Sequence, residues 1–278
     1  MSVATAFEKA RAEGRAALVG YLPAGFPSVP GAIEAIRAMV AAGVDLVEVG
    51  LPYSDPVMDG PVIQRASERA LAGGVRTVDV LRTVEAVADA GAPVVVMTYW
   101  NPVERYGGRA PAEAERGVAA FARDLAAAGG AGLITPDLIP DEAQEWLAAS
   151  DAHGLDRIFL VSPSSTDARI AMTVSHCRGF VYATAVMGVT GARERTSEAA
   201  PKLVARVRAT GTALPVGVGL GVRNGAQAAE VAGYADAVIV GSALVSCLLD
   251  APDEVAGVAA LEALTADLAA GVRAAAPA

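Results

Sequence analysis

The chain has 278 residues, of which 53% are hydrophobic and 19% charged, and its formal net charge is −9. Such a chain can bury a large core, either as one α/β barrel or as two smaller domains. The acidic balance argues against nucleic acid or an anionic membrane as a general partner, so an anionic small substrate would need a local site of backbone N–H groups. Cys177 and Cys247 belong to no CxxC motif and have no histidine at ligand spacing, which predicts reduced thiols in a cytoplasmic protein and no metal site.

The predicted elements alternate between short apolar segments and longer alanine-rich ones. Met1 to Arg15 mixes charged residues with alanine, which predicts an amphipathic helix rather than a signal peptide. Eight β-branched runs predict strands at Ala17–Tyr21, Asp45–Val49, Val94–Thr98, Gly132–Thr135, Arg157–Val161, Phe180–Ala183, Pro215–Val218 and Ala237–Val240. Helical periodicity predicts helices at Gly31–Ala42, Pro61–Ala72, Val78–Ala88, Ala112–Ala128, Asp141–His153, Asp167–His176, Ser197–Ala209, Asn224–Ala232, Ala243–Leu249 and Glu254–Val272. The longest uncharged runs are shorter than the roughly 18 residues of a membrane span, so we expect a soluble protein.

Several of the predicted helices end in a glycine-containing turn that leads into a strand, as at Gly43 and Gly154. Eight β/α units without a linker-like break favour one (β/α)8 TIM barrel over residues 1–278, with an extra N-terminal helix. An open doubly wound sheet is the alternative, and the absence of Gly-x-Gly-x-x-Gly after the first strand weakens it. In a barrel, the ends of the strands and the loops that follow them form the active site.

Two carboxylates stand out under that rule. Glu48 lies near the end of the second predicted strand, inside an apolar run, and Asp59 follows on a loop rich in glycine and proline. Burial of an unpaired carboxylate is unfavourable and raises its pKa. The alternative for Glu48 is a structural ion pair, but the strand cores offer almost no basic partner. The alternative for Asp59 is an ordinary Asp-Gly turn. We therefore predict two carboxylates in unlike surroundings at the mouth of the barrel, with Glu48 as an acid and Asp59 ionised.

Glycine-bearing segments follow the last three strands: Gly188 to Gly191, Gly217 to Gly221, and Gly241-Ser242. The last of these opens a short helix, whose N-terminus would present unpaired N–H groups to a phosphate. Glycines that only permit tight turns are the alternative. Tyr182 could bond Glu48 or a substrate hydroxyl across the barrel, or could simply belong to the core.

The motifs of this chain, taken in order, resemble the signature of the tryptophan synthase alpha chain family. The longest is Leu46-Val-Glu48-Val-Gly50-x-Pro52-x-Ser54-Asp55-Pro56-x-x-Asp59-Gly60-Pro61, followed by Gln64. The others are Tyr21-x-x-Ala-Gly25-x-Pro27, Met97-Thr-Tyr99-x-Asn101-Pro102, Asp137-Leu-Ile-Pro140, Gly179-Phe-Val-Tyr182, Gly188-Val-Thr190-Gly191, Gly217-Val-Gly219 and Val240-Gly241-Ser242-Ala243. They extend over nearly the whole chain, and their combination is highly specific.

The resemblance implies a barrel enzyme of tryptophan biosynthesis that cleaves indole-3-glycerol phosphate to indole and glyceraldehyde 3-phosphate. It implies no cofactor in this chain and a beta-chain partner that carries pyridoxal phosphate, in an α2β2 heterotetramer. Glu48 would be the general acid–base and Asp59 would hold the indole N–H. The other implied roles are Tyr182 for the orientation of Glu48, Thr190 as a hydrogen-bond donor to Asp59 on loop closure, Gly191, Gly219, Gly241 and Ser242 for the phosphate, and Tyr21, Met97, Val218 and Ile239 for the indole.

Two departures from the family pattern accompany the resemblance. Many relatives carry an aromatic residue in place of Val218, and some carry an arginine near Val186. We therefore expect a looser indole wall and a differently anchored loop. The surface around Pro52, Tyr53, Asp55 and Asn101-Pro102 resembles the region that contacts the beta chain. Three alternatives stay open: a lyase that works without a beta chain, a catalytically silent barrel kept as an allosteric partner, and another phosphate-binding barrel such as a sugar-phosphate isomerase.

Overall fold

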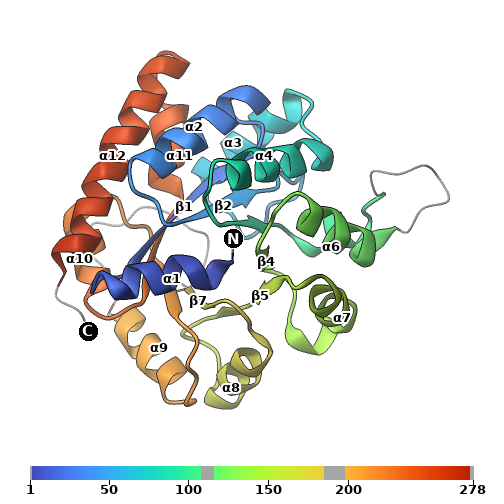
Figure 1. The fold of residues 1–278 in the computed structure, drawn as a ribbon, viewed down its shortest axis with the longest axis vertical. Helices are drawn as coiled ribbons and strands as arrows, with labels where there is room; N and C mark the ends of the chain where they lie inside the picture. The colour runs from blue at the N-terminus through green and yellow to red at the C-terminus, as the bar shows by residue number, and fades with distance from the viewer. Residues whose placement is uncertain (1, 108–115, 185–197, 276–278) are drawn as a thin grey trace.

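The computed structural model describes residues 2–107, 116–184 and 198–275. Its strands form one parallel sheet in the order β5-β4-β3-β2-β1-β9-β8-β7-β6, and Figure 1 labels several of them. The strands are β1 Ala17–Pro23, β2 Leu46–Gly50, β3 Val94–Met97, β4 Gly132–Ile134, β5 Asp156–Ile158, β6 Leu160–Val161, β7 Val181–Thr184, β8 Val216–Gly219 and β9 Ala237–Val240. Phe159 alone separates β5 from β6, so the chain itself joins the two ends of the sheet. The predicted eight-stranded barrel is confirmed, with its fifth strand interrupted at Phe159.

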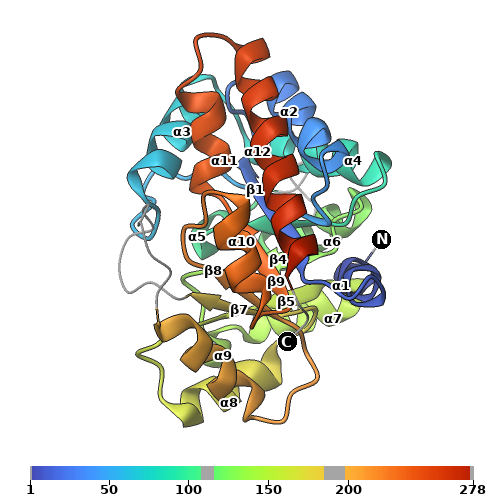
Figure 2. The same ribbon diagram turned by 90° about the vertical axis from the view of Figure 1, so that its left-hand side faces the viewer.

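The helices form a layer around the sheet (Figures 1 and 2). They are α1 Val3–Ala12, α2 Val29–Ala41, α3 Pro61–Ala72, α4 Thr77–Asp89, α5 Trp100–Glu104, α6 Gly117–Ala127, α7 Gln144–His153, α8 Asp167–His176, α9 Ala199–Arg208, α10 Gly225–Ala232, α11 Ser242–Leu249 and α12 Glu254–Ala274, with a 3-10 turn at Pro140–Glu142. Two expectations need correction. The predicted helix Asp141–His153 is divided into that turn and α7, and α5 was not predicted. Residues 112–115 of the predicted helix Ala112–Ala128 lie outside the described residues.

Side chains alternate along each strand between the barrel interior and the helix layer. The interior cluster includes Val19, Leu46, Val95 and Ile239, and α1 adds Phe7 to it. The Phe7 ring lies 5.6 Å from that of Phe180, the residue before β7. Helix α1 therefore covers the N-terminal end of the barrel, as Figure 1 shows. This packing leaves the C-terminal ends of the strands as the place for a site.

Helix α12 is, in the described part of the chain, the one helix long and apolar enough to cross a membrane by length and composition alone. It lies beside α10 and α11 (Figure 2). The approach to α10 is so close that a methyl group at Gly271 would lie 2.1 Å from the carbonyl oxygen of Gly225. Its buried residues include Leu261, Leu268 and Val272, so packing within the helix layer accounts for much of its apolar character.

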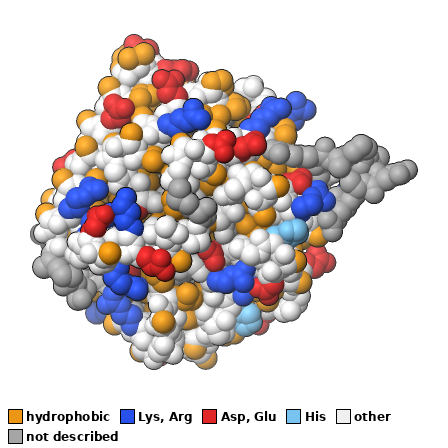
Figure 3. Space-filling model, viewed as in Figure 1, with side chains coloured by type: hydrophobic (Ala, Val, Ile, Leu, Met, Phe, Trp, Pro, Cys, Tyr) orange, Lys and Arg blue, Asp and Glu red, His pale blue; other side chains and the backbone are white. Residues whose placement is uncertain are grey.

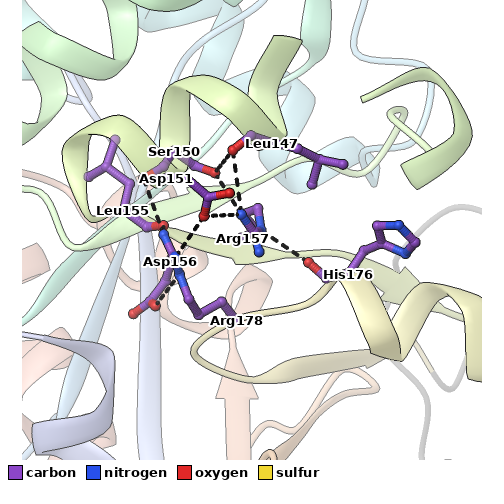
Figure 4. Close-up of polar contacts among 8 residues, drawn as sticks. All are labelled: Leu147, Ser150, Asp151, Leu155, Asp156, Arg157, His176 and Arg178. Carbon is purple, nitrogen blue, oxygen red and sulfur yellow. Dashed lines mark hydrogen bonds and ion pairs between the residues drawn. The ribbon is translucent and has the colours of Figure 1, made fainter. Parts of the chain in front are cut away.

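Arginines hold the N-terminal ends of β5 and β7 (Figure 4). Arg157 donates to the carbonyl of His176 at 3.1 Å and pairs with Asp151 at 2.6 Å. Arg178 donates to Asp151 at 2.9 Å, to the carbonyl of Ser150 at 3.1 Å and to that of Leu155. The carbonyl of His176, the last residue of α8, has no N–H partner within its helix, so Arg157 supplies its donor, whereas the carbonyl of Ser150 also accepts the N–H groups of Gly154 and Leu155. On the face in Figure 3, acidic and basic side chains are interspersed rather than gathered by sign.

Candidate active site

A cavity of about 560 Å³ opens at the C-terminal ends of the strands. It is lined by residues from or directly after nearly every strand: Tyr21, Glu48, Val57, Met58, Asp59, Ile63, Met97, Pro136, Leu160, Val161, Ser162, Ser165, Tyr182, Thr184, Gly219, Leu220, Gly221, Ile239, Gly241 and Ser242. Most of the residues predicted for the site therefore meet in one cavity. Thr190, Gly191 and Val186 lie outside the described residues.

Glu48 projects into the barrel from the middle of β2, between Tyr21 of β1 and Val95 of β3 in the strand register. It is 1% exposed, and its Oε1 atom has no hydrogen-bond partner among the described residues. Burial raises the pKa of Glu48 to about 8, because a carboxylate in an apolar site loses its hydration. The group is thus mostly protonated at neutral pH. Tyr182, which could bond either Glu48 or a substrate hydroxyl, does not donate to this oxygen in the structure.

Asp59 lies on the loop between β2 and α3, and two side chains hold that loop. Gln64 donates to the carbonyl oxygen of Asp59 at 2.9 Å, and the N–H of Met58 donates to the hydroxyl of Tyr99 at 2.9 Å. Burial raises the pKa of Asp59 to about 6, and a hydrogen bond with Tyr99 opposes the rise. Asp59 is therefore mostly ionised at pH 7 while Glu48 is mostly protonated, as expected from their different surroundings.

The phosphate-cradle residues predicted from the late glycines lie together at the ends of β8 and β9. Gly219 and Gly221 line the cavity beside Gly241 and Ser242. Helix α11 begins at Ser242, and no side chain caps its first turn. Its first N–H groups have no acceptor within the helix and carry its partial positive charge. None of the described residues that line the cavity is Lys, Arg or His, so an anion would be held here by backbone groups.

The apolar walls differ from the prediction at one position. Tyr21, Met97 and Ile239 line the cavity, but Val218 does not. Val218 is fully buried in the outer core, and it is paired in register with Val238 of the same cluster. In β8 the inward positions are those of the two glycines flanking Val218, so its side chain packs toward the helices. The prediction that Val218 forms a wall of the indole site is therefore wrong.

Other lining residues were missed because single residues in ordinary contexts carry no signal. Leu160, Leu220 and Ile63 add apolar surface, and Ser162 and Ser165 add hydroxyls. Tyr99 and Gln64 were noted only as parts of motifs. Their place directly after β3 and early in α3 is the signal that could have identified them, because loops at strand ends build barrel sites.

The surface beside the Asp59 loop is aromatic and apolar. The ring of Tyr53 stacks on that of Tyr99 at 5.2 Å, and Asn101 donates to the Tyr53 hydroxyl at 3.2 Å. Val57 is 76% exposed and Met58 43% exposed. Exposed apolar side chains next to a cavity are typical of a protein-binding surface.

This arrangement supports acid–base chemistry on an anionic, partly aromatic ligand. A protonated carboxyl and an ionised carboxylate face one apolar cavity, and unpaired N–H groups lie at its other end. Within the described ranges, no three His, Cys, Asp or Glu side chains are placed to hold a metal ion.

Comparison with known proteins identifies close relatives. Residues 7–273 match the family model described as tryptophan synthase alpha chain. The alpha chain of Salinispora arenicola is 72% identical over 271 residues, which cover 98% of this chain and 97% of that one. The solved structure of Mycobacterium tuberculosis tryptophan synthase contains a chain that superposes with a TM-score of 0.89 at 61% identity, covering 98% of both chains. The alpha subunit from Legionella pneumophila superposes with a TM-score of 0.82 at 33% identity, again over 98% of both.

Proposed function

The chain belongs to the tryptophan synthase alpha chain family, and from this premise we propose that it is a carbon–carbon lyase acting on indole-3-glycerol phosphate. The products are indole and glyceraldehyde 3-phosphate. The observation that carries the proposal is the pair of carboxylates, Glu48 with a pKa of about 8 and Asp59 with a pKa of about 6, facing one cavity. A retro-aldol cleavage needs both a proton donor for carbon and a counter-charge for the ring.

In the proposed mechanism, protonated Glu48 delivers its proton to C3 of the indole ring. The ring becomes cationic, and the ionised Asp59 accepts a hydrogen bond from the indole N–H and stabilises the positive charge. The ionised Glu48 then takes the proton of the adjacent side-chain hydroxyl. The bond between C3 and the side chain breaks, its electron pair returns to the ring, and the side chain leaves as an aldehyde. No step requires a cofactor bound to this chain.

The rest of the cavity binds the substrate. Gly219, Gly241, Ser242 and the first turn of α11 hold the phosphate, and we assign Gly191 to the same group. Met97, Ile239 and the ring of Tyr21 form the flat apolar walls that an indole requires. Tyr182 contacts the glycerol part of the substrate, and Thr190 donates a hydrogen bond to Asp59 when ligand is bound.

The partner is a beta chain that carries pyridoxal phosphate and receives the indole. Its contact surface on this chain includes Tyr53, Val57 and Met58, which belong to the loop that holds Asp59, and Asn101, which donates to Tyr53. Two copies of each chain form an α2β2 heterotetramer, located in the cytoplasm. Binding of the beta chain at this surface would change the position of Asp59 through the stacked rings of Tyr53 and Tyr99.

The test is an assay of indole and tryptophan after incubation with indole-3-glycerol phosphate, with and without a beta chain. We expect slow indole release alone and faster release with the partner. Full activity without a beta chain would contradict the subunit assignment, and an isomerised sugar phosphate without free indole would indicate another phosphate-binding barrel. Glu48→Gln is expected to abolish turnover but retain ligand binding, and residual turnover near the wild-type level would refute the mechanism.

A further inference from the structure

The ring of Tyr21 lies across the mouth of the barrel between two glycines. A methyl group at Gly241, at the end of β9, would meet the Cβ, Cγ and Cδ1 atoms of Tyr21 at 3.5 to 3.7 Å. A methyl group at Gly50, at the end of β2, would lie 2.2 Å from the Tyr21 hydroxyl oxygen. The ring therefore starts beside the phosphate cradle and directs its hydroxyl toward β2. Gly50 is two residues beyond Glu48, so it lies on the same face of that strand.

The hydroxyl of Tyr21 is a hydrogen-bond donor that no described residue uses. Within the described ranges it has no hydrogen-bond partner, and the residue lines the cavity. Burial, with the nearby charges of Asp59 and then Glu48, raises the pKa of Tyr21 well above its ordinary value. The phenol therefore keeps its proton across the physiological range and can donate it to an acceptor.

An unused acceptor lies on the neighbouring strand. Tyr21 and Glu48 are directly paired in the register of β1 and β2, and both line the cavity. The buried Oε1 of Glu48 has no donor among the described residues. The other titratable groups near Tyr21 and Glu48 are Asp59, Tyr182 of β7 and Tyr99. Burial and the charges of Asp59 and Tyr99 raise the pKa of Tyr21. Burial and the charges of Glu48 and Asp59 raise the pKa of Tyr182.

We propose that the hydroxyl of Tyr21 is a positioning group for Glu48: it donates a hydrogen bond to the Glu48 carboxylate once that group has given up its proton. This inference rests on the function proposed above. When the Glu48 proton moves to the ring carbon, a buried carboxylate is left without hydration. The Glu48 side chain rotates about three bonds, so its carboxylate can turn toward the Tyr21 hydroxyl on the paired strand, and the phenol proton stays on its oxygen throughout. Tyr21 is thus a polar partner of Glu48 as well as an apolar wall.

The direction in which the pKa of Glu48 changes when the Tyr21 hydroxyl is removed distinguishes this role from simple packing. A donor to the ionised form lowers the pKa of a carboxyl group, so its removal raises that pKa further. In Tyr21→Phe the ring and its contacts remain and only the hydroxyl is lost. The variant should therefore be slower, because the ionised intermediate is less stable. It should also remain active to higher pH, because the acid form of Glu48 persists longer.

The experiment compares wild type, Tyr21→Phe and Tyr234→Phe as complexes with a beta chain. Tyr234 provides the matched control because its buried hydroxyl is also without a partner among the described residues and it does not line the cavity. For Tyr21→Phe we expect kcat to fall by about tenfold or more, the usual scale for a hydrogen bond to a charged group. KM should change less than about twofold and the alkaline limb of kcat/KM should move up by roughly one pH unit. Tyr234→Phe should match wild type in all three quantities.

A second measurement does not depend on turnover. The carboxyl carbon of Glu48, assigned by comparison with Glu48→Gln, is titrated by 13C NMR in the ligand-free protein. A higher pKa of Glu48 in Tyr21→Phe than in wild type supports the proposal. An unchanged or lower pKa, or an alkaline limb that does not move, overturns it. If wild type releases no indole, the proposed function fails while the titration still decides the role of Tyr21.

Discussion

Replacement of Glu48 with glutamine should make the protein more stable at alkaline pH. The pKa of Glu48 rises from its ordinary value of 4.5 to about 8 on folding, so the folded state holds a proton that the unfolded state has released between these values. Stability contributed by this group is therefore full below about pH 4.5 and is lost as the pH rises to about 8. The total loss is about 5 kcal/mol, from roughly 3.5 pKa units at 1.36 kcal/mol each, of which about 3 kcal/mol falls between about pH 5.5 and pH 9.

The assay is urea unfolding of wild type and Glu48→Gln at those two pH values. Wild type should lose about 3 kcal/mol more than the variant between them. Glu85→Gln, on the exposed side of α4, is the control and should follow wild type. Equal pH dependence of the unfolding free energy in wild type and Glu48→Gln would refute the claim that the carboxyl group of Glu48 is buried without a hydrogen-bonding or charged partner. Asp59 contributes in the same direction in both proteins, because burial also raises its pKa, so it cancels in the comparison.

Three further outcomes test other parts of the structure. Gly241→Ala should leave the unfolding free energy within about 1 kcal/mol, because the three atoms nearest to the new methyl belong to Tyr21 and lie at 3.5 to 3.7 Å, which is ordinary van der Waals contact. The same methyl should raise KM about tenfold in steady-state assays, since it enters the cradle, and an unchanged KM would place the phosphate elsewhere. Arg157→Ala should lower the unfolding free energy by about 2 kcal/mol without changing kcat, because the carbonyl of His176 loses its charged donor; a large fall in kcat would contradict a purely structural role. Val218→Ala should destabilise the protein by about 2 kcal/mol through a cavity in the outer core, and a changed KM for the indole substrate would show that Val218 faces the site after all.

The local elements of this protein follow from its sequence because each is dictated by a short-range pattern. The predicted strand at Ala237–Val240 and the predicted helices at Pro61–Ala72 and Asp167–His176 coincide with β9, α3 and α8. Repetition of the β/α pattern implied a barrel, and its rule that strand ends build the site placed Glu48 and Asp59 together. A charged residue inside an apolar strand was itself the signal, because an uncompensated charge is rarely retained in a core.

What the tertiary structure decided is which way each buried side chain points and what it meets. A parallel strand in a barrel is buried on both faces, so Val-Gly-Val-Gly in β8 carries no alternation of apolar and polar residues that would tell the inner face from the outer one. Only the pairing of Val218 with Val238 directs Val218 toward the helices. In the same way, no local pattern could place the Tyr21 hydroxyl against Gly50. Such contacts join residues far apart in the chain, and their geometry exists only once the barrel has closed.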